Sequence, residues 1–205
     1  MSDRTKNMVV NQLRKRGIID TAVLDAMSTV PRHRFVSRIY QSMAYTDNPL
    51  PIGHGQTISQ PYVVALMTEF LQVDRNHEVL EIGTGCGYQT AILSILSKKV
   101  TTFEVLSSLS KKSRKRLTKL GYNNIDFHCA DGKNGLSKEA PFDRILVSAA
   151  PETIPEVLIE QLAPKGYMVI PVGSLYEQFI NIITKDKNGQ VHIKKSTPVR
   201  FVPLV

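Results

Sequence analysis

The sequence predicts an α/β fold: a mostly parallel central sheet with helices on both faces, an antiparallel hairpin at the C-terminal edge and a helical cover at the N-terminus. Three observations lead to this prediction. A strand-like run, 79–82, passes through a glycine-rich turn into a helical pattern at 89–96, as in a βαβ unit. Short β-branched runs then alternate with helical stretches. Finally, the turn 186–189 separates runs 179–184 and 191–196 in the manner of a hairpin.

The N-terminal segment, residues 5–30, predicts two short helices. Gly17 suits the position just after the first helix, where glycine adopts the left-handed conformation easily. Asp20 has the side chain expected of an N-cap for the second helix, which ends before Pro31. Helices that precede the first strand of such a sheet commonly form a cover, and we expect this one to lie near the ligand end.

Residues 45–61 hold three prolines, two glycines and several small polar residues, so they predict a loop. Few of these residues are charged, which indicates that the loop packs against the rest of the protein. Ser59 lies two residues before Pro61 and is placed to cap a helix at 62–71.

The remaining elements alternate as an α/β fold requires. Glycines follow two of the predicted helical segments and mark their exits. The predicted strands are 100–103, 125–129, 144–148 and 167–171, and the predicted helices are 106–120 and 155–162.

Composition limits the classes of protein to consider. The chain has 205 residues, of which 21% are charged and 42% hydrophobic, as in ordinary globular domains. No apolar run approaches the roughly 18 residues that span a bilayer, and no secretory signal is apparent at the N-terminus. Two isolated cysteines, Cys86 and Cys129, predict free thiols in a reducing compartment, so we expect a cytoplasmic protein. No His/Cys cluster has zinc spacing, and we expect no metal.

The net charge of +8 raises the question of a nucleic-acid partner. Much of this charge lies in residues 14–16 and 111–116. The second run falls on a predicted helix whose leucines take one side, so its basic residues mainly form the solvated side. We therefore favour a solvated helix surface over an RNA-binding surface.

The glycine-rich turn, Gly83-Thr84-Gly85-Cys86-Gly87, is the strongest sign of a ligand site. A strand, a glycine turn and a helix bring backbone N–H groups close to a ligand. The spacing is G-x-G-x-G with Glu81 two residues before it, not the G-x-G-x-x-G of dinucleotide sites. That form resembles the nucleotide-binding loop of S-adenosylmethionine-dependent methyltransferases. Glu104 follows the next strand, where a carboxylate suits a ribose diol.

Further candidates follow other strands, at the end of the sheet where ligands of such folds bind. Asp131 can accept a hydrogen bond from an adenine amino group, and Gly132 lets the backbone approach the ring. The alternative is a plain Asp-Gly turn, and the pattern itself does not decide between the two. Residues 148–150 follow the next strand along the chain.

Several motifs narrow the resemblance to one family, protein-L-isoaspartate O-methyltransferase. The Gly-Gln-Thr-Ile-Ser-Gln-Pro stretch at 55–61 is its most specific part, and the similarity covers nearly the whole chain in order. Cys86, Ala130, Ser37 and the pair Leu136-Ser137 depart from the usual family residues. The matching segments are 30–36, 44–47, 49–53, 55–62, 80–85, 120–122, 140–143, 169–173 and 199–204.

The resemblance implies a Rossmann-like methyltransferase fold in which residues 1–205 form one domain. Residues 1–60 would supply the N-terminal helices and a substrate-side loop, and residues 61–205 the cofactor-binding core and hairpin. The implied reaction moves a methyl group from S-adenosyl-L-methionine to the free carboxylate of an L-isoaspartyl residue and leaves S-adenosyl-L-homocysteine. The expected cofactor-binding residues are Glu81, Gly83, Thr84, Gly85, Cys86, Glu104, Val105, Asp131 and Gly132.

Ser59 is the expected catalytic residue. Its hydroxyl group is suited to donate a hydrogen bond to the acceptor carboxylate and so fix its angle toward the methyl group. The residues themselves favour a helix cap, and the resemblance, which places a functional serine in this segment, favours the catalytic role. The expected substrate-binding residues are Thr57, Ile58, Gln60, Arg200 and Phe201.

The expected partners are isoaspartyl-containing proteins and peptides, with no specific nucleic acid and no membrane, and we expect a monomer. Two other readings stay open. The same fold could methylate RNA or a small molecule, and steep salt-dependent RNA affinity would favour RNA. A non-catalytic cofactor-binding adaptor is the third reading, which the intact glycine turn and the intact Thr57–Gln60 segment disfavour.

Overall fold

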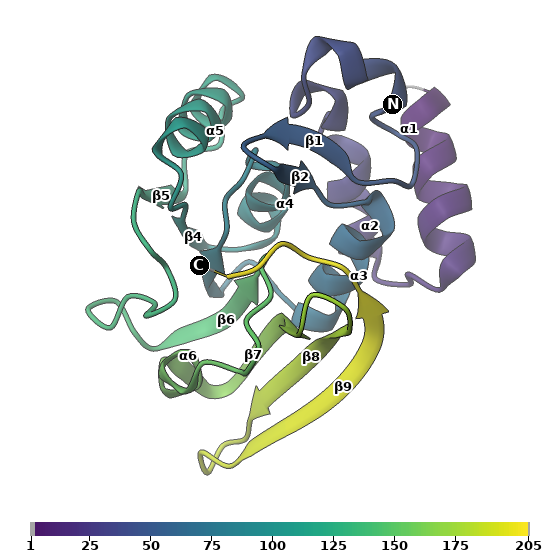
Figure 1. Cartoon of the computed structure of the whole chain (residues 1–205). Coiled ribbons are helices and arrows are strands. Elements are labelled where there is room, and N and C mark those ends of the chain that lie inside the picture. The colour runs from purple at the N-terminus through teal and green to yellow at the C-terminus, as the bar shows by residue number, and fades with distance from the viewer. Residues whose placement is uncertain (1–2, 205) are drawn as a thin grey trace.

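The computed structural model describes residues 3–204, which form a seven-stranded sheet flanked by helices (Figure 1). The strand order in space is β5-β4-β3-β6-β7-β8-β9. β3 to β7 run parallel, and β8 and β9 are antiparallel to their neighbours. The strands are β3 (Glu78–Ile82), β4 (Lys99–Phe103), β5 (Ile125–His128), β6 (Phe142–Val147), β7 (Leu162–Gly173), β8 (Gln178–Lys185) and β9 (Val191–Val199). The predicted parallel sheet with a C-terminal hairpin is confirmed.

Each face of the sheet has its own hydrophobic core because side chains alternate along a strand. On β6, Leu146 belongs to one core, while Ile145 and Val147 belong to the other. The first core also receives buried residues of α2 (Thr21–Thr29), α3 (Pro61–Leu71), α4 (Tyr88–Leu96) and α5 (Ser107–Lys119). The second core is covered more thinly, by α6 (Glu156–Glu160) and the segment before β6.

The N-terminal cover begins with α1 (Asp3–Asn7) and continues through a π-helical turn, Met8–Leu13, and a 3₁₀ turn, Arg14–Arg16. Gly17 ends this stretch with φ of 97°, and the Asp20 side chain accepts hydrogen bonds from the first N–H groups of α2. Both predicted helix boundaries are therefore confirmed. Two further 3₁₀ turns, Arg32–Arg34 and Arg38–Met43, lead toward the proline-rich segment.

The prediction of a plain loop at 45–61 is wrong, because the segment contains the two-stranded hairpin of β1 (Leu50–Gly53) and β2 (Gln56–Ile58). His54 and the glycines on either side of it all have positive φ, which closes a tight turn. In a ribbon of two strands both strands are edges, so a proline such as Pro51 can be accommodated.

The predicted cap of α3 is also wrong. Gln60, not Ser59, is the N-cap residue, and its side chain makes no capping bond. The Tyr62 N–H donates instead to Asp47 Oδ1 at 2.9 Å, and the Asp47 carboxylate also contacts Arg16 and Gln60. An acceptor 15 residues upstream satisfies the helix end, which leaves the Ser59 hydroxyl without a role in capping.

Helices and strands otherwise lie where the sequence predicts them, with shifted ends. α6 ends at Glu160, because β7 starts at Leu162 and is longer than expected. Cys86 and Cys129 are free thiols, as predicted. Within residues 3–204, every helix is too short or too polar to cross a membrane.

Removing the Asp47 carboxylate, which accepts a hydrogen bond from the N-terminus of α3, should destabilise the protein. We expect Asp47→Ala to lower the free energy of unfolding by about 1–2 kcal/mol, as loss of an N-cap acceptor does. Asp47→Asn keeps the oxygen that accepts from Tyr62 N–H and should lose less, since the exposed pair with Arg16 contributes little. Urea denaturation measures both, and Ser59→Ala is the matched control. A larger loss for Ser59→Ala than for Asp47→Ala would contradict this assignment of the cap.

Candidate active site

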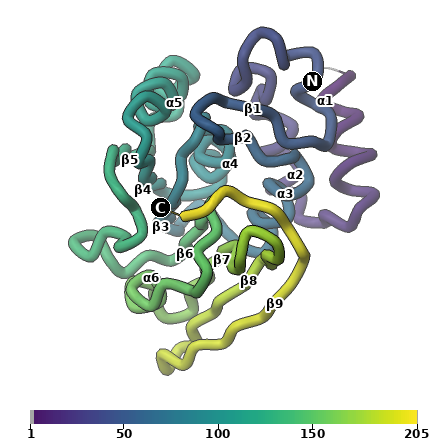
Figure 2. Tube along the Cα trace, viewed as in Figure 1, coloured from purple at the N-terminus to yellow at the C-terminus, as the bar shows by residue number. Residues whose placement is uncertain are grey.

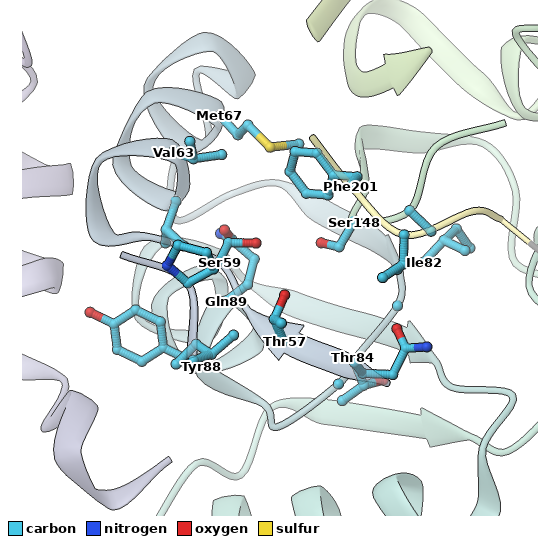
Figure 3. A pocket seen from close by; sticks show the side chains of 18 of the residues that line it. Thr57, Ser59, Val63, Met67, Ile82, Thr84, Tyr88, Gln89, Ser148 and Phe201 are labelled. Atoms are coloured by element: carbon cyan, nitrogen blue, oxygen red, sulfur yellow. The ribbon is translucent and has the colours of Figure 1, made fainter. Parts of the chain in front are cut away.

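A cavity of about 400 Å³ lies at the carboxyl ends of β3, β4 and β6, where the order of the strands reverses. The β1–β2 hairpin and the start of α3 form one side of it. The segment after β9 runs back toward the carboxyl end of β6 (Figure 2). There the N–H of Ala150, which follows β6, donates to the Val202 carbonyl. Figure 3 shows Phe201, Met67 and Val63 along one border and Thr57 and Thr84 along the other, with Ser59 and Ser148 between them.

The glycine turn after β3 is held against the end of β4. The N–H groups of Gly83 and Thr84 both donate to the Phe103 carbonyl, at 2.9 and 3.0 Å. Gly83 has φ of 96°, and a Cβ at Gly87 would lie 2.8 Å from Leu117. The turn can therefore pack tightly between the sheet and α5 because Gly83 and Gly87 have no side chains.

Glu81 does not line the cavity, although the sequence predicts that it binds a cofactor. Its carboxyl group is wholly buried, and Oε2 accepts from the hydroxyl groups of Thr90 and Thr102, each at 2.6 Å. Thr102 is also 2.7 Å from the hydroxyl of Thr84, which does line the cavity. Burial raises the pKa of Glu81 to about 7, and the charge of Glu104 adds to this, while the two threonine bonds oppose it. Glu81 therefore supports the glycine turn through Thr102 and Thr84, without lining the cavity.

Glu104 lines the cavity and is the single carboxylate among its lining residues. It accepts from Gly85 N–H at 2.7 Å and from Leu106 N–H at 2.9 Å, which fixes both of its oxygens. Each carboxylate oxygen has two lone pairs, so acceptor capacity is left for a ligand hydroxyl. Val105 also lines the cavity.

Of the two residues expected to contact adenine, Asp131 and Gly132, only one lines the cavity. Gly132 lines the cavity, and a Cβ there would lie 2.7 Å from that of Phe103. Asp131 is not among the lining residues; its carboxylate accepts from Lys133 N–H at 2.9 Å and pairs with the Lys133 ammonium at 3.0 Å. This is the turn that the Asp-Gly pattern offered as the alternative. A role for Asp131 toward adenine stays a prediction.

Another side of the cavity is built from the segment between β2 and α3 and from the C-terminal segment. The expected catalytic and substrate-binding residues all line the cavity, as the sequence predicts for a shared site. They are Thr57, Ile58, Ser59, Gln60, Arg200 and Phe201. Buried Gln178 positions Phe201 by accepting from its N–H at 2.6 Å and donating to its carbonyl at 3.2 Å. The Ser59 hydroxyl has no hydrogen-bond partner within residues 3–204 and is free to meet a ligand.

Sequence reasoning missed part of the lining. Val63 and Met67 lie on the predicted helix 62–71 at the spacing typical of core residues, yet they also border the cavity. Gln89 lines it too, and its amide donates to Thr68 Oγ1 at 2.9 Å. An apolar position facing a cavity has the same pattern as one facing the core, so no local signal distinguishes them.

The lining offers no group suited to act as a general base at neutral pH. Burial raises the pKa of Tyr88 to about 12, and it also raises the pKa of the Cys86 thiol, so both are neutral. Each oxygen of Glu104 already accepts from a backbone N–H group, which stabilises the carboxylate and makes it a weaker base, and the lining residues include no histidine or lysine.

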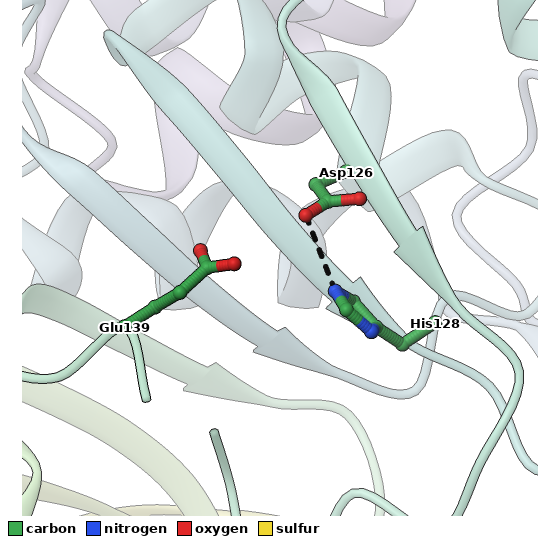
Figure 4. Close-up of side chains that lie close together, drawn as sticks. All are labelled: Asp126, His128 and Glu139. Carbon is green, nitrogen blue, oxygen red and sulfur yellow. Dashed lines mark ion pairs between the residues drawn. The ribbon is translucent and has the colours of Figure 1, made fainter. Parts of the chain in front are cut away.

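A second cluster lies at the far edge of the sheet, where Asp126, His128 and Glu139 approach one another (Figure 4). His128 Nε2 is 3.3 Å from Asp126 Oδ2. The Lys99 ammonium lies 2.7 Å from Glu139 and 3.9 Å from Asp126, so the cluster already contains a cation. We interpret it as a partly exposed ion-pair network that joins β4, β5 and the segment before β6.

Comparison with known proteins identifies the family. The model of the protein-L-isoaspartate(D-aspartate) O-methyltransferase (PCMT) family matches residues 4–205. The chain belongs to this family. Two bacterial relatives, both protein-L-isoaspartate O-methyltransferases, support the assignment. The protein of Opitutus terrae is 48% identical over 98% of this chain and 87% of its own length, and that of Gloeobacter violaceus is 49% identical over 96% of both.

Solved structures of protein-L-isoaspartate O-methyltransferases have the same fold. One is a Plasmodium falciparum protein, assigned to this activity and crystallised with S-adenosyl-L-homocysteine. It is 28% identical, covers 100% of this chain and 99% of its own, and has a TM-score of 0.85. A second superimposes with a TM-score of 0.86 at 27% identity, over 97% of this chain and 65% of its own. These matches confirm the predicted family, fold, reaction and cofactor.

The cavity fits the cofactor of a protein-L-isoaspartate O-methyltransferase. At about 400 Å³ it lies in the range of small-molecule sites. The glycine turn exposes backbone where a Cβ at Gly83 would lie 3.3 Å from Ser148, and the Glu104 carboxylate faces the same space. The residues present therefore offer a close backbone surface and a hydroxyl acceptor, which a nucleoside needs.

The buried carboxyl group of Glu81 should make stability depend on pH. Its pKa is about 7 in the folded protein against an ordinary 4.5, so the folded chain binds this proton more tightly than the unfolded chain. The stability of the native state should therefore fall as pH rises from 4.5 to 7, by up to about 3 kcal/mol. Glu81→Gln, which stays neutral, should lack this fall. Urea denaturation of both proteins between pH 5 and 8 measures the difference, and parallel curves would refute the assignment.

Proposed function

We propose that the cavity brings S-adenosyl-L-methionine and the free carboxylate of an L-isoaspartyl residue together, and that Ser59 orients that carboxylate for methylation. One observation carries this proposal. The unpartnered Ser59 side chain, from the segment before α3, lines the same cavity as the glycine turn and Glu104. Acceptor and cofactor can therefore meet there without any movement of the sheet.

The nature of the acceptor explains why the site needs no base. An isoaspartyl carboxylate has a pKa near 4 and is already ionised at pH 7. The cofactor, when bound, supplies a methyl group on a sulfonium, which is a strong electrophile. What the protein must add is orientation at near-attack distance and exclusion of water. A lining in which Tyr88 and Cys86 are neutral and Glu104 is held by backbone suits this task.

On the substrate side we propose roles for Thr57, Ile58, Gln60, Arg200 and Phe201. Thr57 and Gln60 offer polar groups beside Ser59, while Ile58 is buried and anchors the hairpin. Arg200 is exposed at the border of the cavity, where its guanidinium can meet a peptide carbonyl or carboxylate. Substrates of this kind share a chemical lesion and not a sequence, which suits a surface of small and backbone groups.

On the cofactor side we propose that Gly83, Thr84, Gly85 and Cys86 present backbone to the ligand. Glu104 would accept from the ribose hydroxyls, and Val105 and Gly132 would lie against the base. Glu81 would act through Thr102 and Thr84, without touching the ligand.

We further propose that residues 1–205 work as one domain and as a monomer, since residues of both 1–60 and 61–205 line the cavity. Its expected partners are isoaspartyl-containing proteins and peptides, with no specific nucleic acid and no membrane. A cytoplasmic location agrees with the two free thiols.

Labelled methyl transfer to matched peptides tests the function directly. Two peptides of identical sequence should carry Asp in one and L-isoAsp in the other, with radiolabelled S-adenosyl-L-methionine as donor. We expect base-labile label on the isoAsp peptide and background on the Asp peptide. Equal labelling of both peptides, or of neither, would overturn the proposed substrate.

Replacing Ser59 tests its role. Ser59→Ala should lower kcat on the isoAsp peptide by roughly tenfold, the loss expected for one hydrogen bond to a charged group. Affinity for S-adenosyl-L-homocysteine, measured by calorimetry, should stay within about threefold, because the cofactor contacts proposed above do not include this side chain. An unchanged kcat would remove Ser59 from the catalytic residues.

A further inference from the structure

Arg32 is among the largest fully buried side chains within residues 3–204, with 0% of its surface exposed. It lies in the 3₁₀ turn Arg32–Arg34 and reaches toward the active site without lining the cavity. Its Nε donates to the Ala44 carbonyl at 2.8 Å, and its Nη2 donates to the Ser59 carbonyl at 2.7 Å. The guanidinium also lies over the ring of Tyr88, with Cζ 4.8 Å from the ring centroid.

This arrangement is unusual for a buried cation. Within residues 3–204 no carboxylate lies within ion-pair distance of Arg32, and its buried Nη1 has no acceptor with hydrogen-bond geometry, although the Tyr88 side chain favours the charged guanidinium. Burial of an uncompensated charge is unfavourable, and it lowers the pKa of Arg32. The two carbonyl oxygens and the tyrosine ring offset this only in part.

The two carbonyl groups that Arg32 binds frame the acceptor side of the site. Ala44 precedes the β1–β2 hairpin and Ser59 follows it, so one guanidinium joins both ends of the segment. Asp47 makes a second connection, to Gln60 and to the N-terminus of α3. Ser59 lies between strand and helix, where a regular hydrogen-bonding partner for its carbonyl is lacking, and Arg32 supplies one.

We propose that Arg32 is a positioning residue for methyl transfer: by holding the Ser59 carbonyl, it fixes the direction in which the Ser59 hydroxyl enters the cavity. The proposal rests on the role given to Ser59 above. Without the bond from Nη2, the peptide unit of Ser59 can rotate, and the hydroxyl loses its fixed angle. Misplacement by about 1 Å is enough to reduce a reaction that depends on orientation.

Arg144 provides a matched control, because it is built in the same way at the other end of the sheet. It is 8% exposed, its Nε donates to the Gln72 carbonyl at 3.0 Å, and its Cζ lies 5.0 Å from the centroid of the Tyr167 ring. Arg144 is near the start of β6, whereas the cavity lies at the carboxyl ends of the strands. Loss of either guanidinium removes buried hydrogen bonds to backbone carbonyl groups, but only Arg32 bonds to the expected catalytic residue, Ser59.

A double-mutant cycle tests the proposal on the full chain. The cycle combines Arg32→Met with Ser59→Ala, and kcat on the isoAsp peptide is the readout. We expect Arg32→Met alone to lower kcat by roughly tenfold, like Ser59→Ala. In the Arg32→Met background, Ser59→Ala should lower kcat by less than about twofold, since the hydroxyl is no longer aimed. Affinity for S-adenosyl-L-homocysteine should stay within about threefold.

The control cycle uses Arg144→Met, in which Ser59→Ala should keep its full effect. If Arg32→Met does not fold, Arg32→Lys replaces it, because an ammonium group cannot donate to both carbonyls in the geometry of the guanidinium fork. A full tenfold effect of Ser59→Ala in the Arg32 variants would overturn the positioning role and leave that of Ser59 intact. No effect of Ser59→Ala in the unaltered chain would overturn both.

Discussion

The site depends on one constraint: the chain must leave β3 and turn into α4 while its backbone stays open to the cavity. The two N–H groups that meet the Phe103 carbonyl make this possible, because they join the turn to the end of the neighbouring strand. Both ends of the turn favour glycine, because φ is positive at Gly83 and Gly87 and a Cβ there would lie 3.3 Å from Ser148 and 2.8 Å from Leu117. At Gly83 and Gly85 the lining of the cavity is therefore main chain, held by the neighbouring strand.

A layer of buried polar groups lies behind this turn. Glu81, Thr90, Thr102 and Thr84 form a chain of hydrogen bonds away from solvent. Such a network is stiff when satisfied, since an unpaired group in a low-dielectric interior is costly. The unpartnered Oε1 of Glu81 and its raised pKa show that this site favours the neutral acid. These hydrogen bonds link the glycine turn to β3, β4 and α4, and the buried carboxyl group makes the stability of the protein sensitive to pH.

The sequence predicts these features to different extents. Asp20 and Gly17 carry local signals, because a cap and a helix end involve neighbouring residues, and both predictions are confirmed. The hairpin at 50–58 is missed because a segment rich in proline is assigned to a loop by its composition. The acceptor that caps α3, Asp47, is 15 residues from its donor, so no local pattern could find it. Motif resemblance points to the Ser59 segment and gives its serine a functional role, whereas the local pattern gives it a capping role, which the structure removes.

The two sides of the cavity are built on different principles. The cofactor side consists of strand ends and a turn held by backbone hydrogen bonds, and its geometry follows from the sheet. The acceptor side is a segment with little regular structure, and single side chains hold it: Arg32 and Asp47 at the hairpin, and Gln178 at Phe201. A small cofactor meets a surface of constant shape, whereas a peptide must enter from solvent and leave again. In the proposed function, anchoring the acceptor segment at a few points would keep Ser59 in register with the methyl group and leave the hairpin between Ala44 and Ser59 open to peptides of different sequence. The same arrangement makes orientation vulnerable to the loss of one buried hydrogen bond, far more than the cofactor side is.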